Sequence, residues 1–133
     1  MSLEALVLRT CDDAPVGVLA LYGEVNSETV SKMDGHVATL MHQFGKVVVD
    51  FTHTVYVSSA GWRGLMDESS KKGPARLAVA GMQPSVRDVY DLLGMAYLIT
   101  AYDTVREAVV GVTGTAASAP APRNAKAGIT SAS

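Results

Sequence analysis

The chain has 133 residues, of which 48% are hydrophobic, enough for one domain with its own core and too few for two ordinary ones. Two of the 11 basic residues, Arg123 and Lys126, lie beyond residue 113, whereas all 13 acidic residues precede it, so the part before residue 113 carries a net charge of −4. An acidic domain without a basic stripe argues against direct nucleic-acid binding.

Membrane and redox features are sparse. No apolar run approaches the length of a membrane span, and the N-terminus lacks a basic segment followed by a long apolar one, so the sequence predicts neither a transmembrane helix nor a signal peptide. The single cysteine, Cys11, cannot form an intramolecular disulfide and is expected to pack. These features predict a cytoplasmic protein without membrane insertion.

The first two expected elements are strands over residues 6–9 and 16–22. The cluster 12–15, Asp-Asp-Ala-Pro, has the composition of a turn and joins them into an antiparallel hairpin. Residues 23–26 then break the strand pattern, and Asn26 or Ser27 can cap a following helix. That helix is expected to end at Gly45, because its apolar positions follow the helical period up to there: Val30, Met33, Val37, Leu40, Met41 and Phe44.

The centre of the chain is an apolar, β-branched run over residues 47–51, which predicts a strand buried on both faces. Apolar residues at 62, 65 and 66 predict a helix that opens at Ser58 or Ser59, so both serines lie at a strand-to-helix turn. Residues 71–74, Lys-Lys-Gly-Pro, supply cations, a glycine and a proline, which together form a strong stop signal.

Three further elements and a last helix complete the expected pattern. A short strand is predicted over 77–80, a helix that begins at Pro84 and ends before Gly94, and a last strand over 97–99. The helix has one apolar face, made by Val86, Val89, Tyr90 and Leu93. Residues 104–107, Thr-Val-Arg-Glu, have the form of a capping box that opens the final helix.

This alternation predicts an α/β domain. A largely parallel sheet of five strands with right-handed crossovers, one antiparallel edge strand and about four helices is expected over residues 1–112. Residues 113–133 are mostly Ala, Ser, Thr, Gly and Pro and contain almost no large apolar side chain. Such a segment cannot bury enough surface to offset its ordering entropy, so a mobile tail is expected.

No catalytic or metal-binding constellation is recognisable. His36 and His42 are six residues apart on one predicted helix and therefore lie on different faces. Together with His53 they lack metal-ligand spacing, so solvated or edge-of-core histidines are expected rather than metal ligands. The chain has no Gly-x-Gly-x-x-Gly and no Walker-type Gly-Lys-Ser motif, and we predict no cofactor.

The acidic pairs on the predicted helices also have a simple explanation. Asp67 with Glu68, and Asp88 with Asp91, are explained by solvated helix surfaces without invoking acid or base catalysis.

Two residues near the central turn admit two interpretations each. Ser59 is either a helix cap that matters for stability or a functional hydroxyl, and the sequence pattern alone favours the cap. Trp62, the only tryptophan, is either an interface residue or part of the core, and its spacing to Leu65 and Met66 favours the core.

Several motifs in fixed order resemble those of small bacterial anti-sigma factor antagonists, the STAS-domain proteins. The central one is Tyr-Val-Ser-Ser-Ala-Gly-Trp at residues 56–62, after a strand that ends in Asp50-Phe51. The others are Tyr-Gly-Glu-Val-Asn at 22–26, Pro-Ser-Val-Arg at 84–87, Leu-Leu-Gly-Met at 92–95, and Tyr-Asp-Thr-Val-Arg-Glu-Ala at 102–108. The resemblance covers roughly residues 3 to 111 and implies a STAS domain over residues 1–112.

The resemblance also implies a function without catalysis. The serine that the partner kinase phosphorylates in these antagonists corresponds by position to Ser59, while Ser58 stands where many members have Asp and Asn26 stands where Asp is common. The implied partner-binding residues are Asn26, Ser58, Ser59, Ala60, Gly61 and Trp62. The implied partners are an anti-sigma factor of the serine-kinase type, which the unphosphorylated protein would bind to free a sigma factor, and a PP2C-like phosphatase that would reset it.

Two alternatives remain open at this point. A STAS domain can serve as an adaptor subunit of a membrane lipid- or anion-transport complex, in which case Ser59 is only a cap. An enzyme with Ser59 as nucleophile is the third interpretation, although the sequence offers no base near it.

Overall fold

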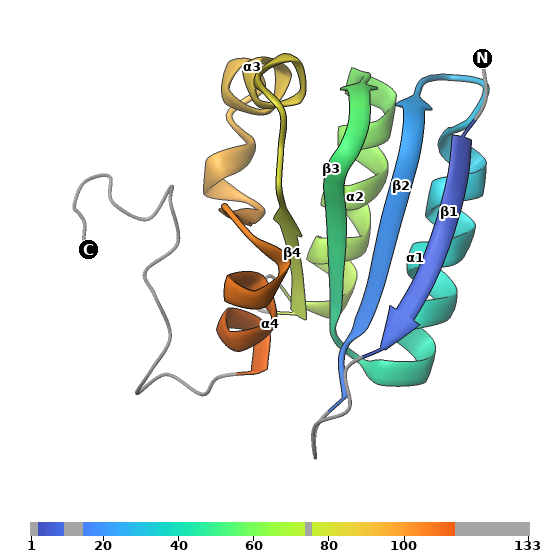
Figure 1. Cartoon of the computed structure of the whole chain (residues 1–133), viewed down its shortest axis with the longest axis vertical. Coiled ribbons are helices and arrows are strands. Elements are labelled where there is room, and N and C mark those ends of the chain that lie inside the picture. The colour runs from blue at the N-terminus through green and yellow to red at the C-terminus, as the bar shows by residue number, and fades with distance from the viewer. Residues whose placement is uncertain (1–2, 10–14, 74–75, 114–133) are drawn as a thin grey trace.

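A five-stranded sheet organises the molecule, and the computed structural model describes residues 3–9, 15–73 and 76–113 of it (Figure 1). The elements in chain order are β1 (Leu3–Arg9), β2 (Gly17–Val25), α1 (Val30–Phe44), β3 (Val47–Val57), α2 (Ser59–Lys72), β4 (Leu77–Ala80), α3 (Pro84–Leu92), the 3-10 helix η2 (Met95–Tyr97), β5 (Thr100–Tyr102) and α4 (Val105–Thr113). Cys11, most of the predicted turn over 12–15, Pro74 and the predicted tail beyond Thr113 lie outside the described residues.

The sheet has the strand order β1-β2-β3-β4-β5. β1 pairs with β2 in antiparallel fashion, with Leu3 opposite Gly23 and Arg9 opposite Gly17, and the other three pairs are parallel. Each parallel pair is joined through a helix, as right-handed crossovers require. The predicted α/β class, with a largely parallel sheet and one antiparallel edge strand, is therefore confirmed.

Helices cover the two faces of the sheet unequally. α1, α2 and α3 pack on one face, where the larger core contains Met33 and Leu40 of α1, Trp62 and Leu65 of α2, and Tyr90 of α3. Figure 1 looks onto the opposite face, with α1 and α2 behind the sheet. On that opposite face α4 contributes Ala108 and Val112 to a smaller cluster with residues of β2 to β5.

Two of the predicted signals at helix ends appear in the structure at Gly45 and Thr104. Gly45 ends α1 in the left-handed region, with φ +76°, and its N–H donates to the Met41 carbonyl at 2.8 Å. Only glycine adopts this conformation without steric cost, which explains why the helix stops there. Before α4, the Thr104 hydroxyl accepts a hydrogen bond from the Glu107 N–H at 3.1 Å.

Strands β2 and β3 extend further than their apolar patterns predicted. β2 runs to Val25 rather than residue 22, and β3 runs to Val57 rather than residue 51. Their parallel ladder continues across register shifts between Ala20 and Tyr22 and again after Gly23, whose φ is +123°. Irregular pairing of this kind disturbs the alternation of buried and exposed side chains. The apolar pattern therefore ends earlier in each strand than the hydrogen-bonded ladder does.

The last strand was misplaced by the sequence pattern. The apolar residues 97–99 are not a strand, because η2 ends at Tyr97 and β5 begins at Thr100. Pairing with β4 sets this position, with Ala78 opposite Thr100 and Ala80 opposite Tyr102. Hydrophobicity identified a segment that leads into the sheet, whereas only ladder partners determine which residues join it.

Candidate functional site

The candidate site is formed at the ends of two strands that lie side by side. Val25 pairs with Val57 at the end of the ladder between β2 and β3, and the Ser58 N–H donates to the Val25 carbonyl at 2.8 Å. The residues that follow, Asn26 after β2 and Ser58–Ser59 after β3, therefore emerge next to each other at the carboxyl ends of two parallel strands. The structure thus brings the two separate parts of the predicted binding set to one end of the sheet.

Ser58, rather than Ser59, caps α2. Ser58 has extended backbone angles, φ −75° and ψ 169°, and its hydroxyl accepts a hydrogen bond from the Gly61 N–H at 3.3 Å. Its carbonyl accepts the bond from the Trp62 N–H that begins the helix, at 3.1 Å. Ser59 is consequently the first helical residue, and it is exposed. The choice between the two serines as cap is settled in favour of Ser58, and the interpretation of Ser59 as the cap was wrong.

Gly61 lets the first turn of α2 approach the sheet. A Cβ atom at this position would lie 2.7 Å from Cγ1 of Val25 and 2.9 Å from Cγ1 of Val57, distances that real Cβ atoms do not adopt. The glycine is therefore needed for close packing rather than for backbone freedom. Because Val25 and Val57 are fully buried, this contact fixes the height at which Ser59 stands above the strand ends.

Trp62 belongs to the core. It is fully buried, its ring meets Phe51 edge-on with centroids 5.5 Å apart, and it lies 5.2 Å from the ring of Tyr90. The spacing argument for a core position is confirmed. Trp62 consequently offers no side-chain surface to a partner. Gly61 is also buried, whereas Ser59 is exposed and Ala60 is half-buried, so of these four predicted residues only Ser59 and Ala60 reach the surface.

A network of hydrogen bonds holds Asn26 in the turn before α1. Its Oδ1 accepts from the N–H groups of Glu28 and Thr29 at 2.9 and 3.1 Å, and its Nδ2 donates to the Glu24 carboxylate at 3.0 Å. The Thr29 hydroxyl donates to the Glu24 carbonyl and accepts from the Asn26 N–H. Thr29 occupies the cap position of α1, which begins at Val30, so the prediction that Asn26 or Ser27 caps this helix was wrong. Asn26 instead stabilises the turn that precedes the helix.

The sequence analysis did not identify the residues of β3 next to the serines as part of the exposed surface. Val55 and Tyr56 are 52% and 40% exposed at the outer end of β3. The N-terminus of α3 holds this part of the strand, because the Ser85 hydroxyl donates to the Val55 carbonyl at 2.7 Å and Gln83 Nε2 donates to the Thr52 carbonyl at 2.9 Å. The position of Tyr56, two residues before Ser58, was the one sequence feature that could have indicated a surface role. Whether the Tyr56 side chain is exposed, however, depends on how far β3 extends.

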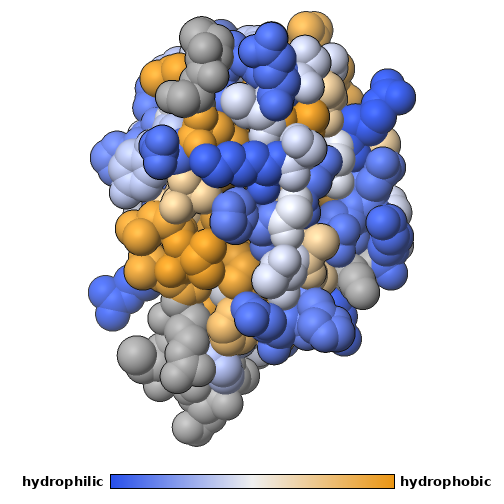
Figure 2. Space-filling view, turned by 90° about the vertical axis from the view of Figure 1, so that its right-hand side faces the viewer, coloured by the Kyte–Doolittle hydropathy of each residue, from blue (hydrophilic) through white to orange (hydrophobic). Residues whose placement is uncertain are grey.

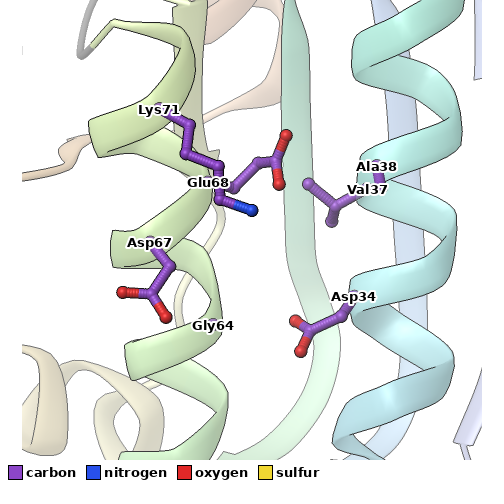
Figure 3. Close-up of a pocket in the computed structure, with 7 residues that line it drawn as sticks. All are labelled: Asp34, Val37, Ala38, Gly64, Asp67, Glu68 and Lys71. Carbon is purple, nitrogen blue, oxygen red and sulfur yellow. The ribbon is translucent and has the colours of Figure 1, made fainter.

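An acidic hollow separates α1 from α2 further along the helices (Figure 3). It measures about 250 Å³ and is lined by Asp34, Val37, Ala38, Gly64, Asp67, Glu68 and Lys71. Burial raises the pKa of the Asp34 carboxyl, and the negative charges of Asp67 and Glu68 raise it further, whereas Lys71 lowers it. Asp67 and Glu68, expected on a solvated surface, thus face a third carboxylate from the neighbouring helix.

The described part of the chain offers no arrangement for catalysis by a metal ion. No group of three or more His, Cys, Asp or Glu side chains within it could hold a metal. His53 stacks on Tyr22, with ring centroids 4.7 Å apart and planes 7° apart, and it is exposed, as expected from the sequence. None of the helices described is long and apolar enough to cross a bilayer. What the serine turn can do is present a hydroxyl, and a surface around it, to another molecule.

Comparison with known proteins agrees with this fold. The family model of the STAS domain matches residues 7–108, and the chain therefore belongs to the STAS domain family. No match to a curated protein sequence reaches significance.

Three solved structures illustrate the likeness in fold. An anti-sigma factor antagonist from Mycobacterium paratuberculosis is 22% identical, with a TM-score of 0.73 over 84% of this chain and 95% of that one. A putative antagonist from Thermotoga maritima is 17% identical, with a TM-score of 0.69 over 80% and 94%. The antagonist SpoIIAA in its unphosphorylated form is 18% identical, with a TM-score of 0.64 over 82% and 97%.

Proposed function

We propose that this protein is an anti-sigma factor antagonist, a non-enzymatic switch that binds an anti-sigma factor of the serine-kinase type while Ser59 is unphosphorylated and releases it after phosphorylation. The observation that carries the proposal is the division of labour between neighbouring serines: Ser58 caps α2, and Ser59 stands exposed on its first turn. A hydroxyl that is not needed as the cap is free to be modified without loss of the helix.

The physical basis of the switch is local. Phosphate adds a charge of about −1.5 to −2 at neutral pH, and the N-terminus of a helix favours negative charge through its dipole and outward N–H groups. The isolated protein should therefore accept the phosphate with its fold intact. At an interface, in contrast, the same charge must lose its hydration and meet partner groups that fitted a small hydroxyl, so the change falls on binding.

The surface around Ser59 supports a protein partner. Asn26, Ser58, Ser59 and Ala60 lie at the same end of the sheet, where exposed Val55 and Tyr56 add apolar area next to polar groups. Gly61 and Trp62 fix this surface from beneath. A structural neighbour supports control by phosphorylation, since SpoIIAA has structures described as unphosphorylated and phosphorylated. A PP2C-like phosphatase would return the protein to its binding form, and the switch would act in the cytoplasm.

The test uses the serine-kinase anti-sigma factors encoded in the protein's own genome, each purified and mixed with this protein and ATP. Mass spectrometry should place one phosphate on Ser59, and Ser59→Ala should abolish it while Ser58→Ala retains it. Titration calorimetry of the same kinase should show Ser59→Ala binding as the wild type does and Ser59→Asp binding at least tenfold more weakly.

Ser70→Asp is the matched control for charge. Ser70 is also exposed on α2 but lies near its opposite end, so the same substitution there should leave binding unchanged. Phosphate on Ser58, or equal weakening by the two Asp variants, would contradict the assignment. Turnover of a small substrate that Ser59→Ala removes would favour the enzyme interpretation instead.

A further inference from the structure

The exposed side of α2 places a positive charge next to Ser59. Ser59, Arg63 and Asp67 are all exposed and follow one another at intervals of four residues. Side chains four residues apart lie on the same face of a helix, with about 5–6 Å between their Cβ atoms. Because helical side chains lean towards the N-terminus of the helix, Arg63 covers the turn that contains Ser59 rather than the turn that contains Asp67.

Arg63 has no partner in the described part of the chain. Its guanidinium takes part in no hydrogen bond, ion pair or cation–π contact there, although Asp67 lies one turn away. The order of the charges explains this, since an acidic side chain pairs best with a basic one four residues after it, whereas Asp67 follows Arg63. The first turn of α2 contains no acidic residue. A negative charge on Ser59 would therefore occupy the favourable position before Arg63.

Basic side chains on the helices beside α2 are already engaged. Lys32 of α1 donates to the Leu3 carbonyl at 2.5 Å. Arg87 of α3 lies 3.8 Å from the Asp91 carboxylate, so it has an acidic partner on its own helix. Of these three cations, Arg63 is the one that the described structure leaves without an acceptor.

We propose that Arg63 binds the phosphoryl group of phosphorylated Ser59, an inference that rests on the function proposed above. A phosphoserine has three acceptor oxygens, and a planar guanidinium donates two parallel N–H groups to a phosphate. Rotation of two exposed side chains is sufficient to form this contact, so α2 keeps its structure. Phosphorylation then changes two groups of the partner surface at once, because Ser59 gains a charge and Arg63 turns away from the partner to meet it.

Negative charges around the serine turn give this contact its importance. The end of β2 and the turn after it, which lie beside the serines, contain Glu24 and Glu28. Both carboxylates oppose a phosphate dianion, as does Asp67 on α2 itself. The outward N–H groups at the start of α2 favour the phosphate whatever residue stands at position 63. Arg63 therefore adds a contribution that substitution can isolate.

The hydrophobic surface of the molecule lies away from this contact. Figure 2 shows the side of the molecule where β1 lies, with a hydrophobic patch on an otherwise largely hydrophilic surface. The exposed apolar residues of β1 are Leu6, Val7 and Leu8, and they pair with the first half of β2. Ser59 stands instead beyond the carboxyl ends of β2 and β3. The contact between Ser59 and Arg63 is therefore electrostatic and open to water, and salt should weaken it.

Phosphorus NMR of the full chain, with phosphoserine incorporated at position 59 during translation, tests the contact without any kinase. A cation favours the phosphate dianion and so lowers the pKa of the phosphate. This pKa should be about 0.2–0.5 pH unit lower in the wild-type chain than in Arg63→Gln, and Arg63→Lys should keep part of the difference. The difference should shrink in about 1 M salt, where screening is strong.

Lys71→Gln is the matched control on the same helix. Lys71 is also exposed, but it lies twelve residues after Ser59, about 18 Å along the helix axis and beyond the range of a screened charge. This variant should leave the pKa of the phosphate unchanged. Circular dichroism verifies that each variant is folded.

Thermal unfolding gives a second readout. Phosphoserine at position 59 should change the unfolding temperature, relative to the unmodified chain, more favourably in the wild type than in Arg63→Gln. Equal phosphate pKa values in the wild type and Arg63→Gln, an equal rise in Lys71→Gln, or equal thermal shifts would overturn the proposal. Because the phosphoserine is installed without a kinase, a kinase that leaves Ser59 unmodified would contradict the proposed function but not this contact.

Discussion

The first turn of α2 and its middle both approach their neighbours at a glycine, but the neighbours differ in kind. Gly61 meets the methyl groups of Val25 and Val57, which are fully buried and branched at Cβ. Gly64 meets the carboxylate of Asp34, the end of a half-buried side chain across the hollow. The first contact cannot adjust without moving the sheet, whereas the second can adjust by rotating one side chain. The serine surface is thus rigidly supported and the acidic hollow is not.

The largest expected effect comes from removing the ring beneath the first turn. Trp62→Ala should lower the free energy of unfolding by about 3–5 kcal/mol, because it leaves a cavity next to Phe51 and Tyr90. Chemical denaturation measures this directly. Within the described residues Trp62 Nε1 is buried without a hydrogen-bond partner, so Trp62→Phe removes an unpaired donor and should cost clearly less. Equal losses for the two variants would argue against the packing account.

The second-largest expected effect on stability comes from the close contact at Gly61. Gly61→Ala should destabilise the protein by about 1–3 kcal/mol, since the new methyl group overlaps two valines, even though alanine has the higher helix propensity. Differential scanning calorimetry would show the loss as a lower unfolding temperature. Gly64→Ala is the matched change in the middle of the same helix, and it should be close to neutral because the Asp34 side chain can turn away. A larger loss at Gly64 than at Gly61 would reverse the comparison.

The two serines of the first turn should differ by less. Ser58→Ala should cost about 1 kcal/mol through loss of the cap bond to the Gly61 N–H, and Ser59→Ala should change stability by less than about 0.5 kcal/mol. Ser59→Asp should leave stability equal or slightly higher, because a negative charge is favourable in the first turn. Urea titrations of the three variants would separate the serines, and a larger cost at Ser59 would mean that it contributes to the cap.

The smallest effect concerns the hollow. Because the pKa of Asp34 is raised in the folded protein, the folded state holds this proton more tightly than the unfolded chain does. The contribution of Asp34 to stability is therefore most favourable below its unfolded pKa and falls as pH rises through its folded pKa. Asp34→Asn should stabilise the protein slightly at neutral pH and leave it unchanged in acid below the unfolded pKa. Denaturation of both proteins across pH would show a constant difference if burial and the neighbouring carboxylates were not the cause.

Local sequence alone determined the order of the elements, the stop of α1 at Gly45, the cap before α4 and the position of β4 over residues 77–80. Each of these rests on a few adjacent residues, whose backbone preferences or apolar runs act without distant partners. The core position of Trp62 also followed from spacing, because the side of a helix that carries Leu65 must face the sheet. The family resemblance then singled out Ser59.

Tertiary structure decided the rest. β2 and β3 reach Val25 and Val57 because each supplies the other's ladder partners, and the same pairing brings Asn26 beside Ser58 across more than thirty residues of sequence. The position of β5 is set by its pairing with β4. Ser58 became the cap because its N–H is held by the Val25 carbonyl, which leaves Ser59 exposed as the first residue of α2. Hydrogen bonds and contacts between distant segments have no local sequence signal, since their energy depends on the partner that folding brings near.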